Sequence, residues 1–253
     1  GRRRLLRFFR GAYRPENMLI TAAGNLEHAA LGRLVRDAFG SMQPVETRAR
    51  PTARPRPRGG IIKRSKPLEQ THLLLGVPSF PRSVEHRYVL SVLNALLGGT
   101  MSSRLFQKIR EQRGLAYSVY SGVNSFADAG FLMVYAGTSP GSAAETVRLV
   151  LHELADLRDR GPTAEEVANA REHLKGSLML SLESTSSRMS NLAQQEIYYG
   201  KQFRLEAMLR GIDRVGPDEV RETCRDLFTR PELGLAVVGR TARFRLPDRE
   251  LAL

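Results

Sequence analysis

Hydrophobic and polar positions divide the first 43 residues into one strand and one helix. Residues 17–23, NMLITAA, are almost continuously apolar and end at Gly24, which is typical of a buried strand. Apolar side chains then recur at helical spacing from Leu31 to Phe39, and Gly40 ends the helix. A single strand and helix cannot bury their apolar faces alone, so we expect them to pack on a partner.

The stretch after this helix has no hydrophobic periodicity. Residues 44–58, PVETRARPTARPRPR, are rich in proline and arginine, which is typical of an extended, solvated linker. Without interleaved aromatic residues, we prefer this interpretation to a nucleic-acid or acidic-membrane patch. The linker separates residues 1–43, the tail of a first unit, from a second domain that we expect over residues 59–245, followed by a tail over 246–253.

The second domain alternates predicted strands with predicted helices. Residues 71–77 predict a strand that enters a turn at Pro78, and residues 115–123 and 130–138 predict a hairpin. Amphipathic helices are predicted at residues 89–97, 103–112 and 186–199 and after Ser142, Thr163 and Gly216, before a closing strand at 233–238. This order predicts an α+β fold in which helices cover one face of an antiparallel-rich sheet.

Turn and capping residues mark the ends of these elements. Gly98-Gly99 follows an apolar helix, and we interpret the pair as a helix C-cap. Residues 142–145 and 163–166 each place a Ser or Thr three positions before a Glu. This spacing predicts two capping boxes, each opening a long helix.

A short motif recurs near the two ends of the chain. Arg14-Pro15-Glu16, an apolar segment and Gly24 recur as Arg230-Pro231-Glu232, an apolar segment and Gly239, about 216 residues later. This repeat indicates two similar units, each ending in helix, turn and strand. If the second unit starts near residue 59, about 160 residues of the first unit are expected upstream of Gly1.

Composition narrows the classes of function. The 253 residues are 42% hydrophobic, but we find no apolar run long enough to span a membrane and no secretory signal. The net charge of +13 would suit a nucleic-acid-binding protein, yet the arginines are spread over the whole chain and many alternate with acids, so we expect no nucleic-acid partner. The single cysteine, Cys224, is interpreted as a buried structural thiol in a reducing compartment. We therefore expect a cytoplasmic protein, with the periplasm left open for the intact protein.

The sequence contains no complete catalytic site. Its five histidines are scattered, and none lies three to five residues from another, the spacing that zinc ligands on one helix face show. Arg82-Ser-Val-Glu85-His86 is close to an inverted zinc motif, but an arginine, which cannot ligate zinc, stands in place of the first histidine. We expect no metal in this chain and no hydrolase activity from it alone.

The most informative stretch is residues 96–138, LLGGTMSSRLFQKIREQRGLAYSVYSGVNSFADAGFLMVYAGT. It resembles the second half of the pitrilysin, insulinase and mitochondrial processing peptidase family of zinc metallopeptidases. Members carry a Leu-Gly-Gly turn, Ser-Ser-Arg-Leu-Phe and Arg-Glu-x-x-Gly-Leu-Ala-Tyr. Further matches lie at residues 14–18, 69–72, 163–167 and 182–184. The chain is similar to this family over nearly its whole length.

The resemblance implies that the two halves of the intact protein have different roles. In such peptidases the zinc motif lies in the first half, so zinc is expected in the intact protein and not here. The second half closes over the peptide and supplies an arginine and a tyrosine, which by motif position are Arg110 and Tyr117. Their side chains could donate to a substrate carbonyl and to the oxyanion that forms on it. The spacing alone favours a simpler alternative, an Arg110–Glu111 ion pair beside an ordinary packed tyrosine.

Other residues of the block are weaker candidates for substrate binding. Gly98 and Gly99 correspond to a longer glycine-rich loop that contacts presequences in processing-peptidase subunits. Val119 and Ser121 share one strand face with Tyr117 by the two-residue period, so we expect them to line the peptide chamber.

Three functions stay open. The chain is the C-terminal part of a zinc-dependent metalloendopeptidase, a metal-free partner subunit of a two-chain peptidase, or a non-catalytic structural homologue such as a respiratory-complex core subunit. The expected partners are a peptide substrate and either the N-terminal zinc-bearing half or a catalytic partner chain. A homodimer is left open, and no membrane partner is expected.

Overall fold

The computed structural model describes residues 1–44, 55–83, 85–229 and 232–251. Contacts divide the chain into two compact units, which are described separately. Unit 1 comprises Gly1–Ala53 and Met179–Gln202, and unit 2 comprises Arg54–Leu178 and Phe203–Leu253. Most of the proposed linker, residues 45–54, lies outside the described residues. The domain boundaries inferred from the sequence therefore stay a prediction.

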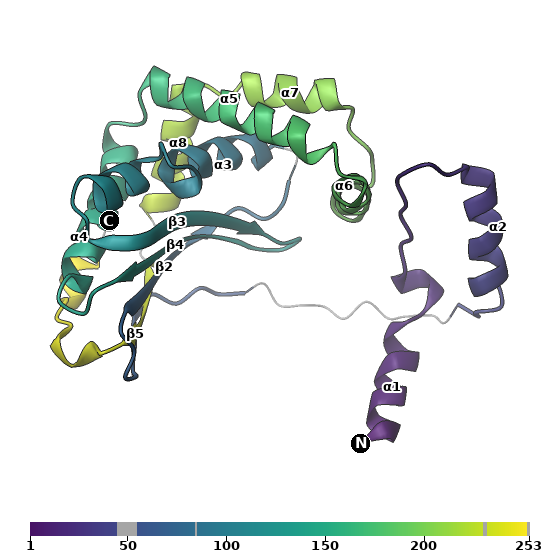
Figure 1. Ribbon diagram of the computed structural model, residues 1–253, viewed down its shortest axis with the longest axis horizontal. Helices are drawn as coiled ribbons and strands as arrows, with labels where there is room; N and C mark the ends of the chain where they lie inside the picture. Colours follow the sequence, from purple (N-terminus) through teal and green to yellow (C-terminus); the bar gives the residue numbers. More distant parts are fainter. Residues whose placement is uncertain (45–54, 84, 230–231, 252–253) are drawn as a thin grey trace. The chain divides into compact units, whose positions relative to one another are not determined.

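Unit 2 is built on one five-stranded sheet (Figure 1). Its strands are β1 Gly60–Ser65, β2 Thr71–Ser79, β3 Ala116–Ser125, β4 Gly130–Thr138 and β5 Gly234–Gly239. The spatial order is β1-β5-β2-β4-β3. The β1–β5 pair is parallel, and the other three pairs are antiparallel. The predicted antiparallel-rich sheet and its hairpin are confirmed.

Helices cover one face of this sheet. They are α3 Arg87–Asn94, α4 Ala143–Asp159, α5 Ala164–Ser181, α7 Leu205–Asp213 and α8 Pro217–Phe228. Helices α3, α4 and α8 contact the strands, and Figure 1 shows α5 and α7 farther from the sheet. Short 3₁₀ turns at Thr241–Arg243 and Asp248–Glu250 follow β5. The predicted α+β arrangement is confirmed.

The core of unit 2 lies between the sheet and these helices. Along β2, Leu73, Leu75 and Val77 are buried and alternate with more exposed residues, because successive strand side chains point to opposite faces. Helix α8 contributes Cys224, which is buried as predicted. Burial raises the pKa of this thiol to about 12, so it stays protonated and unreactive.

Pro78 does not end β2, although the sequence predicts a turn there. The strand continues to Ser79, and Pro78 lies opposite Phe131 of β4. Pairing of β2 with β5 stops at Gly76, so the last residues of β2 have a strand on one side only. An edge position tolerates proline because no ladder hydrogen bond is required of its nitrogen.

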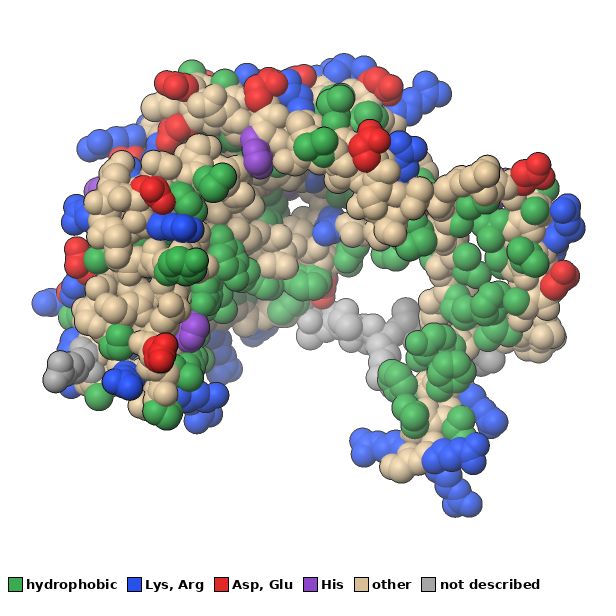
Figure 2. Space-filling view, in the orientation of Figure 1, with side chains coloured by type: hydrophobic (Ala, Val, Ile, Leu, Met, Phe, Trp, Pro, Cys, Tyr) green, Lys and Arg blue, Asp and Glu red, His purple; other side chains and the backbone are tan. Residues whose placement is uncertain are grey.

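Unit 1 contains helices without a described sheet. They are α1 Arg2–Ala12, α2 His28–Phe39, α6 Thr185–Tyr199 and a 3₁₀ turn at Pro15–Asn17. Neither α1 nor α2 buries a residue, and Figure 2 shows apolar side chains gathered over both helices. The helix predicted to end at Gly40 is confirmed. The strand predicted at residues 17–23 is wrong, because a strand needs hydrogen-bonded neighbours and none of the described residues pairs with it.

Both copies of the repeated motif end in a glycine with a positive φ angle. Gly24 has φ +140° and Gly239 has φ +144°, a region that side chains other than glycine rarely adopt. In the second copy, α8 is followed by β5; in the first, α1 is followed by an extended segment. That segment contacts α6 within unit 1, where Thr21 Oγ1 donates to the Met189 carbonyl at 3.2 Å.

The predicted helix ends have mixed outcomes. The Thr163–Glu166 capping box is confirmed: Thr163 N–H donates to Glu166 Oε2 at 2.7 Å, and Glu166 N–H donates to Thr163 Oγ1 at 3.2 Å. The box predicted at residues 142–145 is wrong, since the Ser142 side chain caps no backbone N–H. No helix among the described residues is long and apolar enough to cross a membrane.

Candidate functional site

Two single-turn π-helices flank the site that the sequence predicts. Residues Ala95–Gly99 extend α3, and residues Phe106–Glu111 carry Arg110. The second segment continues into a turn at Gly114, which has φ +60°. Single π turns are uncommon in proteins and concentrate at functional sites. The local backbone therefore marks the segment that carries Arg110.

The Arg110 guanidinium lies between two aromatic rings. Its central carbon is 4.6 Å from the centroid of the Phe106 ring and 5.2 Å from that of Tyr117. Phe106 is half-buried, whereas Leu105 and Ile109 of the same helical turn are fully buried. Aromatic faces attract a cation by about 0.5–1 kcal/mol at exposed sites. The two rings thus hold the guanidinium in place without consuming its N–H donors.

The ion pair expected as the simpler alternative is present but weak. Arg110 Nε lies 3.6 Å from Glu111 Oε1, and both side chains are well exposed, at 38% and 51%. Exposed pairs of this kind contribute about 0–1 kcal/mol. The contact with Glu111 therefore leaves most of the guanidinium available to a ligand.

Tyr117 is placed by an irregularity in β3. Ala116 pairs with Thr138 and Ser118 with Gly137, so Tyr117 is an extra residue without a partner in β4. A β-bulge of this kind re-aims a side chain. The Tyr117 side chain is 77% exposed, and its ring faces Arg110. The structure thus brings the two predicted residues together at one exposed place.

Because of the same bulge, Val119 and Ser121 do not lie on the face of Tyr117, although the sequence predicts that they do. Both are buried on the helix-covered face, at 5% and 6% exposure, and do not share the exposed side of Tyr117. Ser121 Oγ donates to Asn94 Oδ1 at 2.8 Å, so its role is to join β3 to α3. The inserted residue shifts the two-residue period on which the prediction rested.

Gly98 and Gly99 also differ from their prediction as a C-cap. Neither has a positive φ. A Cβ on Gly98 would lie 2.5 Å from the Ser121 nitrogen, and one on Gly99 would lie 2.9 Å from the Asn94 carbonyl oxygen. Gly98 therefore allows the end of this helix to approach β3 closely, and Gly99 packs on the last residue of α3. Gly98 is buried and Gly99 is exposed, and contact of this position with a peptide stays a prediction.

A buried charge cluster anchors the other end of the Arg110 segment. Arg104 Nε donates to Glu166 Oε1 at 2.5 Å, and its Nη1 donates to Asp156 Oδ2 at 2.7 Å. Lys108 Nζ lies 2.8 Å from Glu153 Oε1, and the Glu153 side chain is 2% exposed. These contacts tie the segment to α4 and α5.

The cluster shifts the pKa of both partners in the directions expected of paired charges. Burial alone would lower the pKa of Arg104, but hydrogen bonds to Glu166 and Asp156 raise it above its ordinary range. Burial would raise the pKa of Glu166, but the bonds from Arg104 and Thr163 bring it below its usual value. Both groups are therefore charged at neutral pH.

The helix-free face of the sheet is apolar and aromatic. Tyr120 and Tyr135 are register partners with ring centroids 5.0 Å apart, and Tyr120 is 43% exposed. The Tyr135 hydroxyl lies 2.7 Å from His72 Nδ1. Burial and the neighbouring Tyr120 phenol raise the pKa of Tyr135, so its hydroxyl stays protonated. Figure 2 shows part of this apolar surface as a band over β3 and β4.

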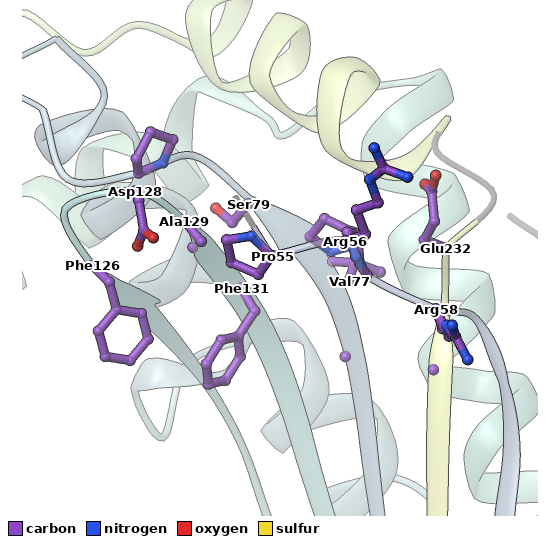
Figure 3. A pocket seen from close by; sticks show the side chains of 16 residues that line it. Pro55, Arg56, Arg58, Val77, Ser79, Phe126, Asp128, Ala129, Phe131 and Glu232 are labelled. Atoms are coloured by element: carbon purple, nitrogen blue, oxygen red, sulfur yellow. The ribbon is translucent and has the colours of Figure 1, made fainter. Parts of the chain in front are cut away.

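A pocket of about 560 Å³ lies at the hairpin end of this sheet (Figure 3). Figure 3 shows Phe126 and Phe131 projecting from the hairpin on the same side, with ring centroids 6.3 Å apart. Residues 55–58 and Glu232 line the opposite side. Its volume falls within the range of small-ligand pockets, roughly 300–1,000 Å³.

The side chains present do not fit a zinc site. Among the described residues, no group of three or more His, Cys, Asp or Glu side chains could hold a metal ion. His86, in the near-miss zinc motif, contacts Ser83 Oγ at 3.1 Å and stacks on Phe80. The carboxylates of Asp156 and Glu166 are already neutralised by Arg104. The described part of the chain therefore offers no set of free ligands to zinc.

Sequence reasoning missed three features of this site. Phe106 could have been found from its position four residues before Arg110, which places both on one helix face. The partners of Arg104 lie about 50 and 60 residues away in sequence and left no local signal. The His72–Tyr135 contact depends on strand register and was equally invisible.

The chain matches known proteins over most of its length. The family described as "Peptidase M16 inactive domain" matches residues 1–174. An uncharacterized zinc protease of Streptomyces coelicolor is 41% identical over 93% of this chain and 53% of its own length. One from Mycobacterium tuberculosis is 43% identical over 94% of this chain and 55% of its own. The chain thus spans about half the length of these curated relatives.

A solved structure has the same fold. The crystal structure of a peptidase M16 inactive domain from Pseudomonas fluorescens superposes with a TM-score of 0.76 at 25% identity. The match covers 88% of this chain and 54% of that one. The chain is therefore similar to relatives in both sequence and fold.

Proposed function

Because the chain belongs to the M16, pitrilysin-like peptidase family and matches its inactive domain, we propose that it holds the substrate of a zinc peptidase. Arg110 and Tyr117 act as hydrogen-bond donors to the carbonyl under attack. The observation that carries this proposal is their contact: the guanidinium lies 5.2 Å from the Tyr117 ring, on an exposed surface. The zinc and its bound water belong to an N-terminal half outside this chain.

The two donors suit different stages of peptide hydrolysis. The guanidinium has five N–H groups and stays charged, so Arg110 can hold a substrate carbonyl before attack. The Tyr117 hydroxyl can donate to the negative oxygen that develops as water adds to that carbonyl. A donor placed in advance stabilises the transition state by about 3 kcal/mol. This chain would thus contribute orientation and charge stabilisation to the reaction.

The supporting surroundings keep both donors in position without blocking them. Arg104 and its carboxylate partners hold the π segment against α4 and α5, while Phe106 supports the guanidinium from one side. The β-bulge turns Tyr117 toward the same place. Rigid support of this kind limits the loss of side-chain entropy when substrate binds.

The proposal is tested with Tyr117→Phe in the intact protein that contains this chain and its zinc-bearing half. Removing the hydroxyl should lower kcat about 100-fold while KM changes little, because the donor acts chiefly in the transition state. Thermal unfolding should be unchanged, since the side chain is exposed. Tyr13→Phe, which also removes an exposed hydroxyl, is the matched control and should leave kcat unchanged.

Zinc content gives an independent test. The isolated 253-residue chain should carry no stoichiometric zinc by plasma mass spectrometry. One zinc per chain, bound by these histidines, would contradict the proposal. Equal kcat for Tyr117→Phe and the parent would refute the role of the Tyr117 hydroxyl, whereas no hydrolysis by either protein would favour a non-catalytic homologue. Activity that appears only on mixing with a separate zinc-bearing chain would identify a metal-free partner subunit.

A further inference from the structure

We propose that the pocket at the β3–β4 hairpin binds an uncharged apolar side chain of the peptide substrate, about six residues from the bond held at Arg110 and Tyr117. The inference rests on the proposed function and adds a second point of substrate recognition. It would make cleavage depend on peptide length and on one distant residue.

A continuous apolar surface joins the two places. On the helix-free face, β4 presents Tyr135, Met133 and Phe131 in succession, and Phe131 lines the pocket. Gly76 and Gly122 lie opposite Met133 on the two neighbouring strands. A Cβ on Gly122 would lie 3.3 Å from Met133 Cε, so the methionine extends over this glycine. Because both neighbours lack side chains, the surface is low enough there for an extended chain to pass.

Strand register sets the length of this path. Gly137 of β4 lies opposite Ser118, the residue after Tyr117. From Gly137 to Phe131 the strand rises about 20 Å, at roughly 3.3 Å per residue. A peptide in extended conformation covers the same distance with about six residues. A substrate shorter than this could reach Arg110 and Tyr117 but not the pocket.

The pocket itself has an apolar lining. Its proline and phenylalanine side chains are Pro55, Pro57, Pro78, Pro81, Phe126 and Phe131. Both signs of charge also line it: Figure 3 shows Arg56, Arg58 and Glu232 on one side and Asp128 on the other, near Phe126. Neither sign dominates, so an uncharged side chain suits the pocket better than a charged one.

Two polar features favour a peptide as the occupant. Pairing of β2 with β5 stops at Gly76, so no strand among the described residues pairs with 77–79 on that side, and an extended chain can add there. Ser79 lines the pocket, is 7% exposed, and its hydroxyl has no hydrogen-bond partner among the described residues. A buried hydroxyl without a partner is costly, and a small movement of the pocket lining would let a bound backbone group satisfy it.

The experiment compares short and long peptides in the intact protein. The short substrates carry three residues on each side of the cleaved bond. The long substrates carry six residues on each side of the cleaved bond, with Phe or Gly at the sixth position from that bond. Phe131→Ala should lower kcat/KM about 10-fold for the long Phe peptide, because burial of one large apolar side chain is weakened. The short and Gly peptides should be unaffected. Ile62→Ala, an exposed apolar residue on β1, is the control.

Each outcome separates this inference from the proposed function. Equal loss for short and long peptides would show a general structural effect and overturn the inference, as would no loss for the long Phe peptide. Phe131→Leu, which keeps apolar bulk, guards against a folding defect and should lose less than Phe131→Ala. The variant is also mixed with a separately produced zinc-bearing half. If Phe131→Ala weakens their association in size-exclusion chromatography, the pocket is an interface between the two halves. Failure of Tyr117→Phe to lower hydrolysis of short peptides would refute the proposed function alone.

Discussion

Two arginines six residues apart occupy opposite environments on the same segment. Arg104 is 10% exposed, and three carboxylates lie within 4 Å of its guanidinium. Arg110 is 38% exposed, with one long contact to Glu111 and two aromatic rings beside it. The first arginine has its hydrogen-bonding groups engaged, and the second keeps most of them available.

The difference separates an anchoring role from a binding role. A buried guanidinium among carboxylates is costly to disturb, because removing it leaves several negative charges without a partner. A guanidinium held by aromatic rings stays in place while its N–H groups face outward. Under the proposed function the segment needs both arginines: Arg104 fixes its position, and Arg110 would meet the substrate. Substitutions at and around the two sites should give separable losses of stability and activity.

The largest expected effect is on stability, from Arg104→Met. Removing the guanidinium takes the close partner away from the Glu166 and Asp156 carboxylates, so the free energy of unfolding should fall by about 3 kcal/mol. Urea unfolding followed by circular dichroism measures the change. Arg113→Met, which breaks an exposed pair with Glu145, is the matched control and should cost less than 1 kcal/mol. If both variants lost the same free energy of unfolding, the buried ion pairs of Arg104 would stabilise the protein no more than the exposed pair of Arg113.

Arg110→Lys should affect activity and leave stability unchanged. Lysine keeps the positive charge but loses the planar set of donors, so kcat/KM of the intact protein should fall about 10- to 100-fold. Urea unfolding should match the parent protein, because the arginine is exposed. A drop in stability comparable with that of Arg104→Met would make Arg110 a second anchor.

A pH series should isolate the Glu166 contribution. The native pKa of Glu166 is lowered, so its stabilisation is present above the pKa of the unfolded chain and is lost as pH falls through the native pKa. The parent should exceed Glu166→Gln by about 2 kcal/mol at pH 7, and the difference should shrink below pH 4. Thermal unfolding of both proteins from pH 7 to pH 3 measures it. A difference that does not change with pH would rule out the charge as its source.

Thr163→Ala should have a smaller effect on the same cluster. Loss of the threonine hydroxyl removes one half of the capping box, at a cost of about 1 kcal/mol. The Thr163 N–H still donates to Glu166, so the Arg104 pair should survive. Thr163→Ser, which keeps the hydroxyl, should restore most of the stability in the same urea measurement.

The smallest effect is expected from Glu111→Gln. Its exposed contact with Arg110 is long, so the free energy of unfolding should change by less than about 0.5 kcal/mol, and kcat/KM by less than twofold. Assays of kcat/KM at low and moderate ionic strength would show whether the Arg110–Glu111 ion pair contributes to activity. A large loss of activity would mean that Glu111, and not the aromatic rings, positions the guanidinium.

Local patterns in the sequence predicted most elements of unit 2. Short strand-like runs next to turn residues identified β2 and the β3–β4 hairpin, and the Thr163–Glu166 spacing identified a cap that the structure confirms. The family motif placed Arg110 and Tyr117 in one stretch. These signals are short-ranged, so they can be read along the chain. The strand expected at residues 17–23 failed because strand formation depends on neighbours outside the segment.

The sequence by itself determined most elements of unit 2, their order, and the two residues to which the proposed chemistry is assigned. Tertiary structure decided which side each residue faces. One unpaired residue in β3 turned Tyr117 outward and left Val119 and Ser121 buried. Carboxylates about 50 and 60 residues away made Arg104 an anchor. The physical reason is that periodicity reports local backbone geometry, whereas exposure and charge pairing depend on residues that meet only when the chain has folded.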